Sequence, residues 1–285
     1  MTLQLDINDY IARTKGDAEL VLRSHLSSDL DLNSEPNKKL LEAAEYTLLG
    51  RAHRWRPILS RALAQNYGND YPDLLPLSCS IEFYHAASLI FDDLPSMDNA
   101  ELRRGQKTCH LKYGEKVALL TGLYLIAIGD TILSDYHDLF KRASDMKKGM
   151  ISAQYGDLTE KPRSIQDILR IIDGKSVGPY AFAVHVGVRC ADGNLIEGWN
   201  EQAITELGRN IGRAYQIADD IGDRVFSSEE LGKDVGKDEG KITSVSLLGL
   251  DGARREAAKY KQEAMCMVRE KELLVNLLDR MIVIS

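Results

Sequence analysis

Helical periodicity runs along almost the whole 285-residue chain, and it limits the possible folds more than any other feature. Apolar residues recur three or four positions apart, whereas alternating runs of β-branched residues are few. The periodic segments are 17–26, 38–49, 117–133, 165–172 and 201–218. Turn signals separate these segments, and the connections between them are short. We therefore predict an all-α fold built as a helical bundle.

The length and charge of the chain narrow the class of protein. With only 7 prolines and no linker-like or low-complexity stretch, the chain fits one large domain over 1–285 with a sizeable core. Its 36 basic and 43 acidic residues give a formal charge of -7. Lysine and arginine dominate the contacts that proteins make with nucleic acid backbones, so we expect no nucleic acid partner.

The cysteines and apolar segments do not indicate a secreted or membrane protein. The four cysteines lie far apart without CxxC or Cys/His spacing, which predicts neither a zinc site nor a disulfide framework. The amino terminus lacks a basic region followed by an apolar run. The longest apolar segment, 117-VALLTGLYLIAIG-129, is too short to span a bilayer. We expect a cytoplasmic protein with no membrane span, in which this segment is a core helix.

The first of two acidic clusters lies in 91-FDDLPSMDNAELRRG-105. His85 and Asp92 are seven residues apart, which places them on one face of a helix that Pro95 should end. Asp92 and Asp93 then stand at a helix carboxyl end, where the macrodipole disfavours negative charge. This arrangement lowers stability unless a cation is bound.

The second acidic cluster, 219-DDIGD-223, ends another apolar periodic run. Asp219 and Asp223 lie at i and i+4 and face the same way, with Asp220 beside them, so their like charges repel. Either cluster alone could be a solvated helix end, but in a bundle two such ends can converge across a cavity. Magnesium takes carboxylate, water and phosphate oxygens, with one or two protein carboxylates for each ion. The two clusters therefore predict a magnesium site.

Basic residues accompany both clusters. Arg103 and Arg104 follow the first cluster, 232-GKDVGKDEGK-241 follows the second, and 50-GRAHRWRP-57 brings further cations together. Carboxylates for metal, with separate arginines and lysines for phosphate oxygens, predict a site for one or two diphosphate groups. No P-loop, GxGxxG or kinase signature is present, so nucleotide chemistry is not favoured.

These motifs resemble those of the trans-isoprenyl diphosphate synthases, also called short-chain polyprenyl synthetases. The DDxxxxD motif followed by LRRG stands at 92–105, and the DDxxD motif stands at 219–223. Further similarity lies at 152-SAQYGDL-158, 174-GKS-176, 215-YQIADD-220 and 231-LGKDVGKDEGKITSVSLLGLDGAR-254, and the resemblance covers about residues 40–255. The spacing of the first motif resembles the bacterial and plant type. The resemblance implies the isoprenoid synthase fold, a bundle of antiparallel helices around a central cavity, and a homodimer.

The resemblance also implies the cofactor and the residues that would hold it. Magnesium, as three ions when substrate is bound, would be held mainly by Asp92, Asp98 and Asp219, with Asp93, Asp220 and Asp223 in support.

The same resemblance implies two substrates. The allylic diphosphate (dimethylallyl, geranyl or farnesyl) would be bound by Arg103, Lys175 and Lys233, and isopentenyl diphosphate by His53, Arg56, His85 and Arg104. Lys241 is a further substrate-binding candidate. Ser176 and Gln216 fall where the family steadies the developing carbocation, and with Lys175 and Lys233 they are the expected catalytic residues.

Two places qualify what the resemblance implies. His53 stands where the family has a lysine; a histidine is only partly charged near neutral pH, so binding of isopentenyl diphosphate should be weaker or pH-dependent. Ala87 and Ser88, five and four positions before Asp92, are small and leave room for a long product, although Tyr124 could form a floor. A tunnel wall would also include Phe83 and Tyr84, unless these pack in the core.

The expected function is a prenyl transferase that works by ionisation, condensation and proton elimination, with geranylgeranyl diphosphate as the favoured product. Farnesyl diphosphate is the alternative product. A terpene cyclase would need an Asn/Ser/Glu metal motif in place of DDIGD, and the basic residues for isopentenyl diphosphate would be superfluous. A non-catalytic partner subunit would typically have lost aspartates that are complete here.

Overall fold

The computed structural model describes residues 6–27, 31, 33–68, 72–189, 194–226 and 242–285. Helices dominate these residues, as predicted, and the only paired strands among them form one short hairpin. The elements are α1 (Ile7–Leu26), α2 (Glu35–Leu48), α3 (Trp55–Asn66), α4 (Leu74–Asp92), β1 (Leu102–Arg103), β2 (Gln106–Lys107), α5 (Cys109–Tyr113), α6 (Glu115–Ile132), α7 (His137–Thr159), α8 (Ile165–Ile172), the π-helix η1 (Asp173–Val177), α9 (Gly178–Val188), α10 (Glu201–Val225), α12 (Ser244–Met267) and α13 (Glu272–Met281).

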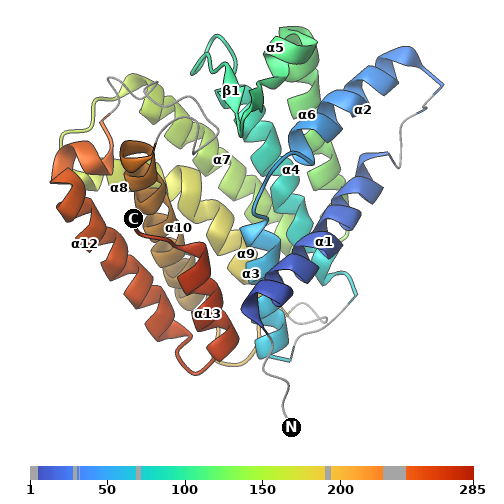
Figure 1. The fold of residues 1–285 in the computed structure, drawn as a ribbon. Coiled ribbons are helices and arrows are strands. Elements are labelled where there is room, and N and C mark those ends of the chain that lie inside the picture. The colour runs from blue at the N-terminus through green and yellow to red at the C-terminus, as the bar shows by residue number, and fades with distance from the viewer. Residues whose placement is uncertain (1–5, 28–30, 32, 69–71, 190–193, 227–241) are drawn as a thin grey trace.

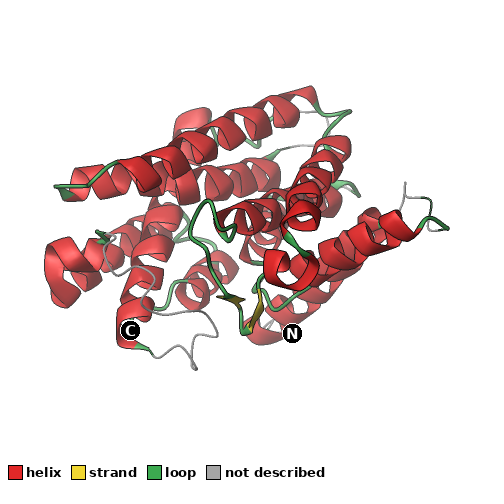
Figure 2. Ribbon diagram, turned by 90° about the horizontal axis from the view of Figure 1, so that it is seen from above, coloured by secondary structure: helices red, strands yellow, loops and turns green. Residues whose placement is uncertain are grey.

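The helices pack in two groups that meet at α3, α4 and α9 (Figure 1). One apolar core lies among α3, α9, α10, α12 and α13, and a second lies among α1, α2, α4 and α6. A third core joins α4 to α7 and α9. Figure 2, which views the molecule from above, shows the β1–β2 hairpin on the upper face of the bundle. The all-α prediction is confirmed, and the same packing brings the carboxyl ends of α4 and α10 toward one cavity.

Both acidic clusters lie at helix ends, as the sequence predicts. The α4 helix ends at Asp92, with Asp93 as its C-cap, three residues before Pro95. The α10 helix begins at an Asn200 cap, whose side chain accepts from the Ala203 amide at 2.9 Å, and runs to Val225, just beyond the second cluster. Negative charge therefore gathers where the helix dipoles already disfavour it.

Only one face of the longest apolar segment is buried in the core. In α6, Ala118, Leu125 and Ile128 are buried, but Leu119, Leu120 and Leu123 are exposed by about half of their surface. The expectation of a core helix is therefore corrected, because the buried stripe follows the helical period while the opposite face is also apolar.

Among the described residues, one helix, α4, is long and apolar enough for its length and composition to fit a membrane span. Most of its apolar window, 67%, is buried inside the protein. A core helix of a globular protein has the same properties.

Glycines allow α10 to approach its neighbours closely. A Cβ on Gly208 would lie 2.4 Å from the Ala181 Cα of α9, and a Cβ on Gly212 would lie 2.7 Å from the Val177 Cα of η1. Gln216 and Asp220 continue this stripe at intervals of four residues, so they face the same neighbours. The glycines thus set how deeply the second acidic cluster is seated.

Gly208→Ala should therefore lower the free energy of unfolding, by about 1–3 kcal/mol as in other overpacked interiors. Gly149→Ala in α7 is the matched control, because a Cβ there has no atom within 4 Å and alanine favours a helix by roughly 0.5–1 kcal/mol over glycine. Urea unfolding of both variants measures the difference. Equal stability of the two variants would contradict the close packing of α10 on α9.

Candidate functional site

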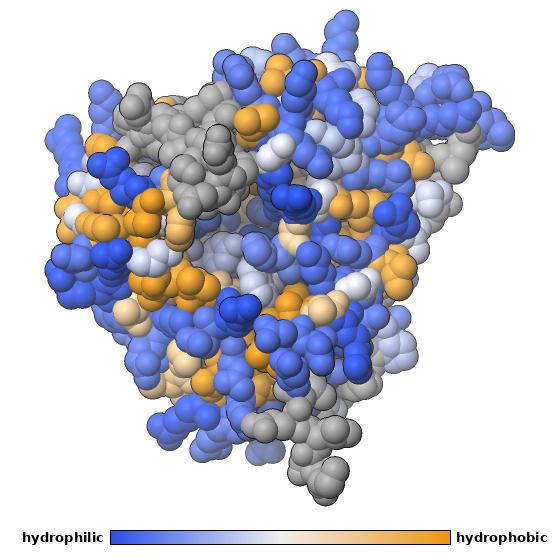
Figure 3. All heavy atoms as spheres, viewed as in Figure 1, coloured by the Kyte–Doolittle hydropathy of each residue, from blue (hydrophilic) through white to orange (hydrophobic). Residues whose placement is uncertain are grey.

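A cavity of ≈ 1230 Å³ opens between the two groups of helices. Asp92 at the end of α4 and Asp219 near the end of α10 both line it. Basic and apolar residues make up much of the remaining wall, and Figure 3 shows this face of the molecule hollowed near its centre. Segments remote in the sequence therefore converge on one space that is large enough for more than one ligand group.

The two cavity carboxylates have different environments. Asp92 is half-buried, and burial raises its pKa to about 6, while the nearby positive charge of Lys175 acts in the opposite direction. Asp219 is exposed toward the cavity. A buried carboxylate at a helix carboxyl end is unfavourable when charged, and a bound cation relieves this cost.

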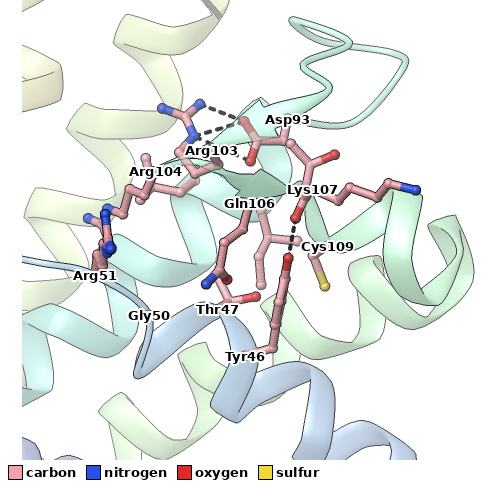
Figure 4. Close-up of a pocket in the computed structure, with 13 residues that line it drawn as sticks. Tyr46, Thr47, Gly50, Arg51, Asp93, Arg103, Arg104, Gln106, Lys107 and Cys109 are labelled. Atoms are coloured by element: carbon pink, nitrogen blue, oxygen red, sulfur yellow. Dashed lines mark hydrogen bonds and ion pairs between the residues drawn. The ribbon is translucent and has the colours of Figure 1, made fainter. Parts of the chain in front are cut away.

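Asp93, adjacent to Asp92, turns away from the large cavity and holds Arg103. The Arg103 guanidinium donates to both carboxylate oxygens of Asp93, with Nη2–Oδ1 at 2.5 Å and Nε–Oδ1 at 3.1 Å. Burial raises the pKa of Asp93, against the opposing effect of Arg103. Figure 4 shows this pair, with Arg104 extending toward Arg51 on the other side. Asp93 is thus built to position an arginine.

The remaining aspartates of the two clusters are not among the residues that line the cavity. The Asp98 amide donates to the Asp92 carbonyl at 2.9 Å, which folds the loop back over the end of α4. Asp220 accepts from the Ser244 hydroxyl at 2.8 Å and from Gln216 Nε2 at 3.2 Å, and burial raises its pKa to about 6. Asp223 is half-buried one turn beyond Asp219.

The donor set fits a hard divalent cation that is held partly by its substrate. The described ranges contain no group of three or more His, Cys, Asp or Glu side chains arranged to hold a metal. Asp92 and Asp219 nevertheless offer carboxylate oxygens from two sides of a roomy cavity that is otherwise rich in cations. Magnesium is typically bound by one or two carboxylates together with water and substrate phosphate oxygens.

A buried ion-pair network underlies one basic part of the wall. Glu82 of α4 accepts from Arg54 Nη1 at 2.9 Å through Oε2, and its Oε1 lies 3.8 Å from Arg56 Nη1. Arg54 also donates to the Leu48 carbonyl and adopts a left-handed backbone, with φ 61°. A non-glycine residue in this conformation is uncommon and often marks a functional segment. The network fixes Arg56 at the cavity wall.

The surroundings of both histidines at this part of the cavity favour the neutral ring. Burial lowers the pKa of His85 well below its usual range, and Arg56 and Arg104 lower it further. His53 is exposed toward the cavity but partly desolvated, and this lowers its pKa, as do the charges of Lys15 and Arg104. The lowered pKa agrees in direction with the expectation that His53 is at most partly charged near neutral pH.

Arg104 is presented by the turn of the hairpin. Leu102 pairs with Lys107 and Arg103 with Gln106, which leaves Arg104 and Gly105 as the two turn residues, at φ 55° and 79°. Two residues with positive φ are the signature of a tight type I′ hairpin turn. The turn therefore directs two adjacent arginines differently, Arg103 toward Asp93 and Arg104 toward Arg51 (Figure 4).

The π-helix η1 supplies the residues opposite the hairpin. Lys175 donates to Asp157 Oδ2 of α7 at 2.8 Å and lines the cavity. Ser176 donates to Gln216 Oε1 of α10 at 2.8 Å, and both residues line the cavity. π-Helical turns within helices often occur at functional sites. The two other expected lysines, Lys233 and Lys241, lie outside the described residues.

Apolar side chains of α6 and α7 form another part of the wall, which includes Leu123, Ile126, Met150, Ile151 and Leu158. Of the residues expected to set the product length, Ser88 lines the cavity, whereas Ala87 and Tyr124 are not among the lining residues. Ala87 is 1% exposed and packs in the core with Phe83. Ala87 and Ser88 differ because adjacent helix positions point about 100° apart. The Tyr124 hydroxyl donates to the Leu26 carbonyl at 2.7 Å.

Some residues of the site could not be anticipated from the motifs. Lys15 of α1 lines the cavity, far from any motif in the sequence. Glu82 lies three residues before His85 and is buried. Its acidic side chain within an apolar helix is the one sequence signal that could have indicated its role. Asp157 lies inside the SAQYGDL motif, but only the structure shows that it holds Lys175.

Sequence comparison relates the chain to known prenyl-diphosphate enzymes. The polyprenyl synthetase family profile matches residues 37–278. Geranylgeranyl pyrophosphate synthase 10, mitochondrial, of Arabidopsis thaliana is 34% identical over 245 residues, which cover 81% of this chain and 71% of the relative. A dimethylallyltranstransferase of Fischerella ambigua is 32% identical over 301 residues, with 97% of this chain and 83% of the relative covered.

Solved structures show the same architecture. A geranyltranstransferase from Thermotoga maritima superposes with a TM-score of 0.79 at 27% identity, with 94% of this chain and 96% of that chain covered. A geranyltransferase from Helicobacter pylori, complexed with magnesium and isoprenyl diphosphate, gives a TM-score of 0.77 at 28% identity, with coverage of 95% and 96%. The predicted resemblance is thereby confirmed, and the chain belongs to the polyprenyl synthetase family of prenyl transferases.

Proposed function

We propose that the protein is a magnesium-dependent prenyl transferase that joins isopentenyl diphosphate to an allylic diphosphate and releases geranylgeranyl diphosphate. The observation that carries the proposal is the placement of Asp92 and Asp219 in one cavity wall with two separate sets of basic residues. The names of the relatives, geranylgeranyl pyrophosphate synthase and dimethylallyltranstransferase, support the reaction class.

Asp92 and Asp219 are the proposed principal ligands of magnesium, with Asp98 completing the first cluster and Asp220 and Asp223 supporting the second. Bound magnesium supplies Lewis-acid stabilisation of the negative charge that builds on a departing diphosphate. Asp93 is proposed to position Arg103 and not to bind magnesium directly, because its carboxylate already accepts from Arg103.

The allylic diphosphate is the proposed ligand of Arg103 and Lys175. Each cation is held from behind by a carboxylate, Arg103 by Asp93 and Lys175 by Asp157. Such pairs fix the geometry of the cations before substrate arrives, and preorganised charge stabilises a leaving group without reorganisation during the reaction. We also propose Lys233 and Lys241 as substrate-binding residues, and this proposal rests on the family resemblance alone.

Isopentenyl diphosphate is the proposed ligand of Arg56, His85 and Arg104, with His53 beside them. The arginines carry the charge, and the neutral histidines offer ring nitrogens as hydrogen-bonding groups. Arginine suits this task because its planar guanidinium can donate two parallel hydrogen bonds to phosphate oxygens.

The chemistry needs no side-chain nucleophile. The allylic C–O bond breaks and the electron pair leaves with diphosphate; the double bond of isopentenyl diphosphate then forms the new C–C bond, and a proton passes to the released diphosphate. Ser176 and Gln216 present linked hydroxyl and amide dipoles to the cavity, with the Ser176 hydroxyl donating to Gln216 Oε1. Both residues line the cavity in which we propose that the positive charge develops.

A twenty-carbon product is proposed because small Ser88 faces the cavity next to the apolar wall of α6 and α7. We also propose, from the family resemblance, that the protein is a cytoplasmic homodimer; the exposed leucines of α6 offer apolar surface that a second copy could cover. Sedimentation of the purified protein tests the dimer.

Purified protein should be incubated with magnesium, labelled isopentenyl diphosphate and, in turn, dimethylallyl, geranyl and farnesyl diphosphate. We expect incorporation of label, with twenty-carbon diphosphate as the main product. A fifteen-carbon product would replace the proposed product while keeping the reaction class. No incorporation with any primer would sink the enzyme proposal.

Ser88→Phe should shorten the main product by one five-carbon unit, because the ring would occupy the cavity beside Phe91. Ala87→Phe is the matched control one residue away, where the ring enters a packed core and should lower the free energy of unfolding by about 1–3 kcal/mol. Product chromatography and thermal unfolding distinguish the two outcomes. An unchanged product from Ser88→Phe would refute the placement of the tunnel along this face of α4.

A further inference from the structure

Lys15 belongs to the wall of the main cavity although it lies outside the family match at 37–278. It is carried by α1 and is half-buried beside the same cavity wall that contains His53, Arg56 and Arg104. Within the part of the chain that the structure describes, Lys15 forms no ion pair with a carboxylate. Its ammonium is therefore a charge available to a ligand in the cavity.

The position of Lys15 is fixed by how α1 packs against α3. Arg61 of α3 donates to Asp17 at 2.5 Å, and Glu19 lies 3.8 Å from Arg54 Nε. Lys15 and Glu19 are one helical turn apart and so share the face of α1 that is directed toward the start of α3. Since Arg54 itself lines the cavity, this register places Lys15 at the same edge.

The environment of His53 indicates that another residue supplies positive charge at this part of the cavity. His53 stacks on Trp55, with ring centroids 5.4 Å apart and planes 7° apart, which holds the imidazole at the cavity wall. Partial burial lowers the pKa of His53, and the charges of Lys15 and Arg104 lower it further, against a smaller opposite effect of Asp219. The lowered pKa favours the neutral ring, which can form a hydrogen bond, and Lys15 is the charged neighbour on α1.

We propose that Lys15 is a diphosphate-binding residue for isopentenyl diphosphate and that it supplies, from α1, a positive charge at the part of the cavity wall that contains His53. The proposal rests on the prenyl transferase function proposed above. An ammonium group beside a diphosphate provides a charge-assisted hydrogen bond, which is about twice as strong as a neutral one. The proposed positive charge thus comes from the amino-terminal helix instead of the segment at 50–57. Both positions line the same cavity.

Lys15→Met tests the proposal, because methionine keeps an unbranched side chain and removes the charge. We expect the KM for isopentenyl diphosphate to rise about tenfold, with the KM for the allylic diphosphate nearly unchanged. Lys15→Arg should keep most of the wild-type affinity. Arg13→Met is the matched control, because Arg13 is an exposed cation of the same helix that does not line the cavity; its kinetic constants should equal those of the wild type.

A charge-relocation variant separates binding from structure. In Lys15→Met/His53→Lys the cation returns to the neighbouring position, and the KM for isopentenyl diphosphate should recover most of the loss. Calorimetric titration of isopentenyl diphosphate into each protein gives a readout that is independent of turnover. An unchanged KM in Lys15→Met, or an equal rise in both KM values that the double variant does not reverse, would overturn the proposal. Wild-type protein that is inactive with every primer would instead overturn the proposed function, before any variant is compared.

Discussion

Asp92→Asn and Asp219→Asn should each reduce prenyl transfer on the order of a thousandfold while the helical fold persists. Asparagine keeps the size of the side chain but loses the negative charge needed to hold a divalent cation. A thousandfold loss corresponds to about 4 kcal/mol of transition-state stabilisation, which is typical of losing a principal electrostatic contribution. Both carboxylates line the same cavity from different helices, so either loss should be sufficient.

The fold of Asp92→Asn should be retained or stabilised in the absence of ligand. Burial raises the pKa of Asp92 to about 6, so its charged form is disfavoured in the free protein, and a neutral amide removes that cost. Asp145→Asn on α7 is the control, because its exposed carboxylate pairs only with the adjacent-turn Lys148 among the described residues, and wild-type activity is expected. Turnover near the wild-type rate in Asp92→Asn or Asp219→Asn, measured at saturating magnesium, would refute these assignments.

The arrangement of the two acidic clusters could be predicted because it depends on local rules. Helical periodicity, Pro95 and the DDIGD spacing indicate two carboxylate-bearing helix ends, and both α4 and α10 end there. The direction of each carboxylate could not be predicted in this way. Asp92 and Asp93 are adjacent in sequence, yet one lines the cavity and the other holds Arg103, because adjacent helix positions point about 100° apart.

The product-length residues show the same limit. Ala87 and Ser88 are both small, and the sequence does not distinguish them, but the helix buries Ala87 in the core and turns Ser88 to the cavity. Motif analysis could not identify Lys15 as a residue of the cavity wall, since its position depends on how α1 packs against α3 through Asp17 and Glu19. Contacts between segments remote in sequence carry no local pattern, so the structure is needed to reveal them.

Glu82→Gln should lower the free energy of unfolding by about 3–5 kcal/mol, the usual cost of removing one partner from a buried ion pair. Glu82 and Arg54 each expose only 2% of their side chains, so the variant leaves the buried guanidinium of Arg54 with only the partly exposed Glu19, 3.8 Å away, as a counter-charge. Glutamine matches glutamate in size, and a loss of stability therefore reports charge rather than packing. Urea unfolding at neutral pH measures the change.

Glu45→Gln is the matched control for this prediction. The Arg23 Nη1 and Glu45 Oε1 atoms are 3.5 Å apart, but the two side chains expose 62% and 40% of their surface, so water screens the pair and its loss should cost no more than about 0.5 kcal/mol. Inorganic diphosphate should raise the melting temperature of Glu82→Gln more than that of the wild type, because a bound anion can replace the missing charge beside Arg56. Equal destabilisation by Glu45→Gln and Glu82→Gln would show that the buried network does not hold the basic wall of the cavity together.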